Sequence, residues 1–87
     1  MQYEANSVDI SALKDDDLLS RATTAQALTA AGYPTKPSTL ATKACRGGGP
    51  PYQLYGRMPL YEWGKALSWA RSRLSAPISS SSEIGRQ

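Results

Sequence analysis

The sequence contains no histidine and only one cysteine, Cys45. A lone cysteine cannot form a disulfide within the chain, and without histidine it cannot complete a four-ligand zinc site. The lack of histidine also removes the commonest general base and the pairs in which histidine activates a serine or cysteine nucleophile. We therefore expect no catalytic residues, no enzymatic activity, no bound metal and no cofactor.

Long apolar runs are also missing. No stretch approaches the ~20 apolar residues that a membrane span requires, and no basic and then apolar run marks a secretory signal. The 87 residues suffice for one small domain, whose core is thin because such a domain buries only about 60% of its unfolded surface. We expect a cytoplasmic protein with no membrane partner and, since a thin core leaves no deep pocket, no small-molecule substrate.

Charge is divided unevenly along the chain. Residues 1–19 carry five acids and one lysine, a net charge of −4, whereas residues 20–76 carry eight cations against Glu62 alone, a net charge of +7. Residues 77–87 are neutral, so the whole-chain value of +3 conceals a strongly basic middle. Such an excess favours a polyanion as partner. A charge that merely keeps the protein soluble is the alternative.

The pattern of residues predicts three regions. Residues 1–17 are polar and aperiodic, and we expect a flexible acidic segment with at most one weak helical turn. Residues 18–76 have the regular apolar spacings of a folded domain. Ala76-Pro77 ends that domain, and the serines that follow predict a disordered tail over 77–87.

Two helices joined by a short turn begin the predicted domain. Ser20 is a suitable N-cap for a helix over 21–31, because its hydroxyl can accept from the free amides of the first turn. Gly32 can adopt the left-handed conformation that ends a helix. Pro37 and Ser38 begin a second helix, with Ser38 as candidate cap and 39 to about 46 as the body. This helix has little apolar surface, which suits contact with a hydrated and charged partner.

A hairpin and a third helix follow a cluster of glycines and prolines at 47–51. The runs 52–55 and 58–61 flank Gly56-Arg57, which is a hairpin signal. Pro59 has no amide hydrogen, so it requires its strand to be an edge strand. Helical spacing resumes from 62 or 63 to 74, and one face collects the apolar side chains. These are Trp63, Ala66, Leu67, Ala70 and Leu74.

The predicted fold is mostly α with a small β-hairpin, in the order of a winged helix-turn-helix: helix, turn, helix, two-stranded wing and C-terminal helix. The DNA major groove admits one α-helix, and its walls are phosphate. The second helix of such a module enters that groove, and the wing reaches an adjacent groove or the backbone. Cations at both places release counterions. We therefore expect double-stranded DNA as the partner.

Several motifs add a family resemblance to this interpretation. They are Leu18-Leu19-Ser20, Gly32-Tyr33-Pro34, Ser38-Thr39-Leu40, Arg46-Gly47-Gly48-Gly49-Pro50-Pro51-Tyr52, Tyr55-Gly56-Arg57 and the segment from Trp63 to Trp69. From about Leu18 to Leu74 the chain resembles the excisionase and AlpA-like branch of the MerR-type winged helix-turn-helix proteins, and more narrowly the RdfS-type recombination directionality factors. The resemblance implies cooperative binding of adjacent DNA sites near the end of a mobile element. It also implies DNA bending and the direction of a tyrosine recombinase (integrase) toward excision.

Carried over position by position, the resemblance assigns DNA contacts to the second helix, the residue before it and the wing tip. These residues are Lys36, Ser38, Thr39, Thr42, Lys43, Arg46 and Arg57. Ala41 and Thr42 stand where relatives often have arginine, and Lys43 stands where an aromatic or aliphatic residue is common. Both departures favour recognition by shape and phosphate over a rich base code.

Structural roles compete with several of these assignments. Ser38 can cap its helix as well as bind DNA, and Arg46 can stabilise the helix C-terminus through the dipole. Trp69 lies off the apolar stripe, where an exposed tryptophan would indicate a partner surface. Asp15-Asp16-Asp17 indicates a solvated start or the charge at a helix N-terminus, rather than a metal site. We expect Cys45 to be a small packing residue.

Three functions fit these observations. The first is an architectural excisionase that associates with the nucleoid and assembles cooperatively on DNA through the hairpin, the N-terminal segment or the Trp69 surface. The second is a stand-alone transcriptional regulator, because the same module serves both roles. The third is an interaction module that recruits the recombinase without contacting DNA.

Overall fold

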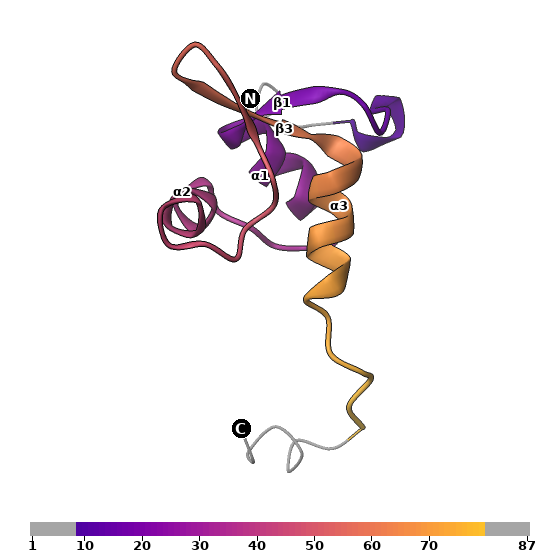
Figure 1. Ribbon diagram of the computed structural model, residues 1–87. Helices are drawn as coiled ribbons and strands as arrows, with labels where there is room; N and C mark the ends of the chain where they lie inside the picture. Colours follow the sequence, from indigo (N-terminus) through magenta and orange to yellow (C-terminus); the bar gives the residue numbers. More distant parts are fainter. Residues whose placement is uncertain (1–8, 80–87) are drawn as a thin grey trace, which may run out of the picture.

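Three helices pack beneath a three-stranded antiparallel sheet in the computed structural model, which describes residues 9–79 (Figure 1). In chain order the elements are a 3-10 turn η2 (Ile10–Ala12), β1 (Leu18–Ser20), α1 (Arg21–Ala30), α2 (Pro37–Arg46), β2 (Gln53–Tyr55), β3 (Met58–Glu62) and α3 (Trp63–Ser72). The predicted order of two helices, a hairpin and a third helix is confirmed. Within the described residues, no helix has the length and apolar character needed to cross a membrane.

The sheet contains a strand that the sequence pattern did not predict. β1 pairs antiparallel with β3, with Leu19 opposite Tyr61, and β2 pairs with the other side of β3. The expectation of a two-stranded sheet in a mostly α fold was therefore wrong, and the fold is mixed α and β. Leu18–Ser20 is too short to show an alternating pattern. Only the return of the chain through β3 supplies its hydrogen-bonding partner.

Pro59 lies in the central strand of this sheet, not in an edge strand as expected. β1 pairs only with Leu60, Tyr61 and Glu62, so no strand flanks β3 on that side at Pro59. On the other side Pro59 faces Leu54, next to the pair that closes the two-residue turn. That position does not exchange backbone hydrogen bonds in such a hairpin. The central strand tolerates proline because the sheet has a local edge at this residue.

Both ends of α1 form as the sequence predicts. The hydroxyl of Ser20 accepts a hydrogen bond from the amide of Thr23, in the first turn, at 3.2 Å. At the other end Gly32 has a φ of 104°. The amide of Tyr33 donates to the carbonyl of Leu28 at 2.8 Å, and that of Gly32 donates to Thr29 at 3.1 Å. These two bonds form a Schellman motif, which fixes the direction in which the chain leaves α1 toward α2.

The start of α2 differs from the prediction. Lys36 is the N-cap residue, Pro37 is the first helical residue, and no side chain caps the helix. The predicted cap, Ser38, therefore lies inside the first turn. Proline suits the first position because its φ is already helical and no amide hydrogen is needed there. It begins the helix without using the hydroxyl of Ser38.

The core lies between the sheet and the inner faces of α1 and α3. Its buried apolar residues are Leu19, Ala25, Ala27, Leu28, Leu40, Tyr61, Trp63, Ala66 and Ala70. The predicted inner face of the third helix is confirmed for Trp63, Ala66 and Ala70, and Leu67 packs partly buried against the same cluster. Leu74 was wrongly included: it is 65% exposed, because α3 ends at Ser72.

The acidic segment before β1 is attached to the start of α3. The amides of Trp63 and Gly64 donate to the carbonyls of Asp17 and Asp15 at 2.9 and 2.8 Å. No side chain caps α3, so these carbonyls satisfy amides that a helix leaves free at its N-terminus. The acidic side chains also suit the positive end of the helix dipole. Of the two roles predicted for these acids, a solvated start or a charge at a helix N-terminus, the second agrees with the structure, and the helix is α3.

Residues 9–17 were expected to be flexible, but part of this segment packs on the domain. Ile10 and Leu13 contact the hydrophobic core. Residues 77–79 have neither helix nor strand, in keeping with the expected end of the domain. The remainder of the predicted flexible start and tail, 1–8 and 80–87, lies outside the described residues, and the division into three regions stays a prediction.

Candidate nucleic-acid interface

α2 contributes little to the core and leaves most of its surface free. Leu40 is its only buried residue and packs α2 against α1. Ser38, Thr42 and Arg46 follow one another at four-residue steps, so they form a row on the face opposite Leu40. All three are exposed. The helix therefore presents two hydroxyls and one guanidinium along its outer side.

Thr39 and Lys43 form a second row, beside the first. They border a shallow depression of about 250 Å³ shared with Ser38 and Thr42. They also border a groove of about 270 Å³ on the other side, between α2 and the C-terminal half of α3. Lys43 is half-buried. Its direction was open from the sequence, and its stem lies at the boundary between the outer face and this groove.

The loop from α2 to the hairpin is held by α3. Gly47 and Gly48 have φ values of 94° and 90°, and the carbonyl of Gly48 accepts from Nε1 of Trp69 at 2.8 Å. A Cβ added to Gly49 would lie 2.9 Å from Cβ of Lys43, so the loop also runs close against α2. Glycine is needed here both for the positive φ values and for this close approach.

Trp69 is thus a structural anchor as well as a surface residue. It is half-buried, packs against the core, and supports the guanidinium of Arg73, which lies 5.2 Å from its ring centroid. Its indole connects α3 to the loop that sets the position of the hairpin relative to α2. This role could not be predicted from the sequence, because the bonded carbonyl belongs to a glycine 21 residues away.

The hairpin ends in a tight turn that carries a cation. Gly56 has a φ of 63°, and no residue other than glycine has a positive φ within 9–79. This combination indicates a type II′ turn with glycine first and Arg57 second. Arg57 is exposed, and residues 47–61 contain no acid. The turn therefore presents an isolated positive charge.

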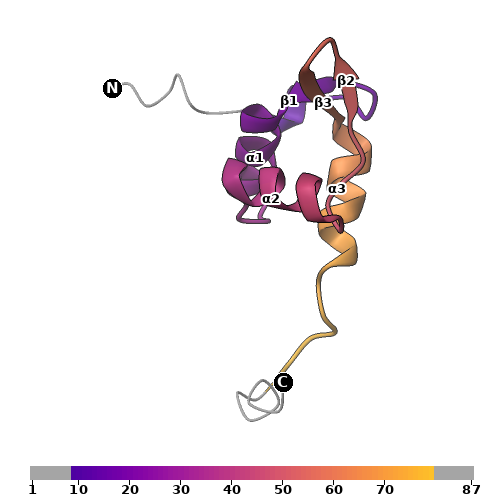
Figure 2. The same ribbon diagram turned by 60° about the vertical axis from the view of Figure 1, so that its left-hand side comes forward.

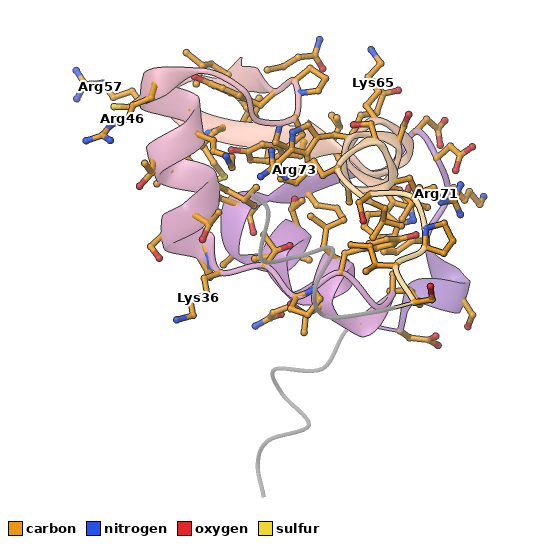
Figure 3. All side chains as sticks on the ribbon, turned by 90° about the horizontal axis from the view of Figure 1, so that it is seen from below. Lys36, Arg46, Arg57, Lys65, Arg71 and Arg73 are labelled. Atoms are coloured by element: carbon orange, nitrogen blue, oxygen red, sulfur yellow. The ribbon has the colours of Figure 1, made fainter. Side chains whose placement is uncertain are left out.

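Arg46 and Arg57 project from the same edge of the molecule in Figure 3, with Lys36 at the other end of α2. Figure 1 shows α2 and the hairpin tip on one side of the body and α3 on the other. In Figure 2, where that side comes forward, α2 lies in front and the hairpin rises above it. The outer row of α2 and the hairpin tip therefore belong to one face of the molecule.

Besides Arg73, which lies over Trp69, two cations of the basic middle region have partners inside the protein. Nε of Arg21 donates to the Tyr61 hydroxyl at 3.0 Å, and its guanidinium lies 6.0 Å and 5.9 Å from the ring centroids of Tyr52 and Tyr61. Lys65 pairs with Glu62 at 3.2 Å, the one ion pair within 9–79. Arg21 fastens the base of the hairpin to α1, a role that the charge count alone did not reveal.

Acidic residues lie away from the face formed by α2 and the hairpin tip. The segment with Asp9, Asp15, Asp16 and Asp17 runs at the right of Figure 1, by the start of α3, and α2 lies at the left. The acids are therefore separated in space from Lys36, Arg46 and Arg57. Three other cations, Lys65, Arg71 and Arg73, lie on α3 or directly after it.

The predicted site residues share this face, with one at its border. Lys36, Ser38, Thr39, Thr42, Arg46 and Arg57 are exposed, and Lys43 is half-buried. Their contact with DNA stays a prediction. The expectation that Cys45 packs inside was wrong, since it is an exposed free thiol.

Comparison with known proteins identifies no relative of this chain. No protein-family model matches the chain, and no curated protein or solved structure matches it. The exposed hydroxyls and cations of α2 and the hairpin tip are therefore the features that bear on function.

Proposed function

We propose that the chain is a winged helix-turn-helix protein that binds double-stranded DNA, with α2 in the major groove and the β2–β3 hairpin as its wing. The observation that carries this proposal is the row of Ser38, Thr42 and Arg46, exposed opposite the only buried residue of α2. A groove-binding helix needs such a free face, and an α-helix fits the major groove in width. Arg57 on the same face supplies the second contact, at an adjacent groove.

The chemistry of this face favours phosphate and shape over direct base readout. The hydroxyls of Ser38 and Thr42 are short donors and acceptors that suit a phosphate oxygen or any base edge. Lys36 and Arg46 lie at opposite ends of α2, where each can meet the phosphates that line the groove. Only Arg46 on the outer row has the reach and the fork of donors for bidentate recognition of guanine. One such residue gives little sequence specificity.

A protein of low specificity gains selectivity when several copies bind adjacent sites. The resemblance of the sequence to excisionases favours one such role. The protein would then be an architectural factor that binds attachment-site DNA cooperatively and promotes excision of a mobile element by a tyrosine recombinase. A stand-alone transcriptional regulator would use the same α2 and wing.

A footprint on the DNA that flanks the protein's own gene tests the proposal. An architectural excisionase protects an array of adjacent sites, and its addition increases excision in a recombination assay. A single short protected site at a promoter, with no effect on excision, would favour the regulator. Absence of any protection at low salt would contradict DNA binding altogether.

One observation favours a second function, the binding of a partner protein such as the recombinase. The groove between the α1–α2 turn, α2 and α3 has an apolar lining that includes Tyr33, Trp69 and Leu74, with Lys43 and Arg73 at its sides. This combination suits a peptide with an apolar side chain beside a carboxylate. Arg73→Glu should then abolish recombinase binding while DNA affinity falls only slightly. Unchanged recombinase binding by this variant would exclude the groove.

A further inference from the structure

Exposed large apolar side chains gather on the hairpin. Of the seven within residues 9–79, four belong to the hairpin region: Tyr52, Leu54, Tyr55 and Met58. Leu54 is 65%, Tyr55 76% and Met58 53% exposed. Side chains this open add almost nothing to the core, so folding does not account for their apolar character. Apolar surface concentrated in one place marks a contact with another molecule.

Strand register places these side chains on both faces of the hairpin tip. Tyr55 is opposite Met58 at the turn, and Leu54 is opposite Pro59 one step further back. Because successive side chains of a strand alternate, Tyr55 and Met58 lie on one face and Leu54 lies on the other. Arg57 stands between them in the turn. The tip is therefore a thin apolar blade with one cation at its end.

We propose that this tip acts as an apolar wedge in the DNA minor groove: Leu54, Tyr55 and Met58 contact the sugar walls and open a base step, while Arg57 lies in the groove. This inference rests on the proposed DNA binding and adds to it how the wing makes contact. Inserted apolar side chains unstack base steps and kink the duplex in other minor-groove binders.

The chemistry of the tip and its surroundings selects DNA as the occupant. The hairpin and the loop before it carry no acid, and the tip shares its face with Lys36 and Arg46. DNA offers sugar walls for the apolar side chains and negative potential for the cation in the same groove. A protein partner would need a separate acidic group at Arg57 and would have to avoid the phosphates bound to α2.

The dimensions explain why such contact deforms the duplex. Two paired strands lie about 4.8 Å apart before any side chain is added. The minor groove is only about 6 Å wide. The tip with its apolar side chains therefore enters only if the groove opens, which is easiest at flexible pyrimidine–purine steps such as TA.

The test compares Leu54→Ala/Tyr55→Ala with Leu18→Ala. Leu18 is a matched control because it is also an exposed leucine of the sheet, at 50%, but lies opposite Glu62, at the end away from the hairpin turn. Bending is measured by energy transfer between dyes at the ends of a single-site duplex with a TA step under the wing. We expect the double variant to bind about tenfold more weakly and to lose most of the bend. Its salt dependence should be unchanged, since all cations remain.

Three outcomes separate this inference from the proposed function. Wild-type protein that does not bind the duplex contradicts both. A double variant that binds and bends DNA as the wild type does overturns the wedge alone. Loss of cooperativity on adjacent sites, with single-site affinity and bend unchanged, also overturns it and assigns the patch to a second copy of the chain.

A third variant allows the proposal to be tested even if the double variant does not fold. Met58→Ala changes only the β3 side of the blade and should reduce the bend part of the way, with circular dichroism like that of the wild type. An unchanged bend in this variant, when Leu54→Ala/Tyr55→Ala is unfolded, overturns the wedge.

Discussion

At the scale of single residues, Arg46 and Arg57 differ from Lys65 in where they lie and in what surrounds them. Arg46 and Arg57 are exposed on one face, whereas Lys65 on α3 is paired with Glu62 at the end of β3. A cation that meets a phosphate releases a counterion, and one that is elsewhere does not. Position on the molecule, rather than total charge, should therefore decide which substitutions affect DNA binding.

We expect Arg46→Ala and Arg57→Ala each to weaken DNA binding and to reduce the salt slope by about 0.9. Lys43→Ala should have a smaller effect of the same sign, because Lys43 is half-buried at the border of the groove. Mobility-shift titrations at several salt concentrations measure the slopes, with Lys65→Ala as the matched control. Equal slopes for all four proteins would refute the placement of the interface.

Gly64 provides a prediction about stability. Alanine normally stabilises an open helix position by about 1 kcal/mol relative to glycine. Here the added Cβ would lie 2.9 Å from Cβ of Asp15, in the loop that caps α3. Gly64→Ala should therefore destabilise the fold by about 1–3 kcal/mol, as overpacking does.

Urea unfolding of Gly64→Ala beside Ser68→Ala, an exposed position of the same helix, checks the sign. An increase in stability for Gly64→Ala would mean that the acidic loop does not rest on α3.

At the scale of elements, most features that depend on neighbouring residues could be predicted, with the cap at Ser38 as the exception. Contacts between distant segments could not. The cap at Ser20, the end at Gly32 and the turn at Gly56 depend on a few neighbouring residues, and all three form as expected. β1 was missed because its only strand partner is β3, more than forty positions away in the pairing of Leu19 with Tyr61. Three residues paired at that separation leave no periodic pattern.

The candidate site divides in the same way. Helical spacing alone puts Ser38, Thr42 and Arg46 in one row, so the outer face of α2 could be predicted. The bond between Trp69 and Gly48 and the contact of Arg21 with two tyrosines could not, since side chain and partner come from different elements. Together with the pairing of β3 with β1, those two contacts hold the hairpin in place.

Trp69→Phe tests whether α3 sets the position of the hairpin. Phenylalanine keeps an aromatic ring in the core but lacks the indole N–H that donates to Gly48. We expect a loss of about 1 kcal/mol in the free energy of unfolding and weaker DNA binding, because α2 and the hairpin are no longer held in register. Urea unfolding and binding titrations measure the two effects. Lower stability with unchanged DNA affinity would limit the bond to a structural role.

At the scale of the whole molecule, the acids of the described residues are separated from the cations of α2 and the hairpin tip, although α3 carries cations of its own. The acidic segment caps α3 on one side, and α2 and the hairpin tip carry cations on the other (Figure 1). If the chain binds DNA as proposed, we expect this separation to favour an approach with α2 foremost and to raise the association rate at low salt.

We propose above all that α2 and the hairpin tip together bind duplex DNA through phosphate contacts. The most direct measurement is the affinity for a duplex that holds one protomer, followed over a range of salt concentrations. Lys36, Lys43, Arg46 and Arg57 offer up to four such contacts, so we predict a slope of log K against log salt of about −3 to −4. A slope near zero, or no binding at low salt, would contradict the claim.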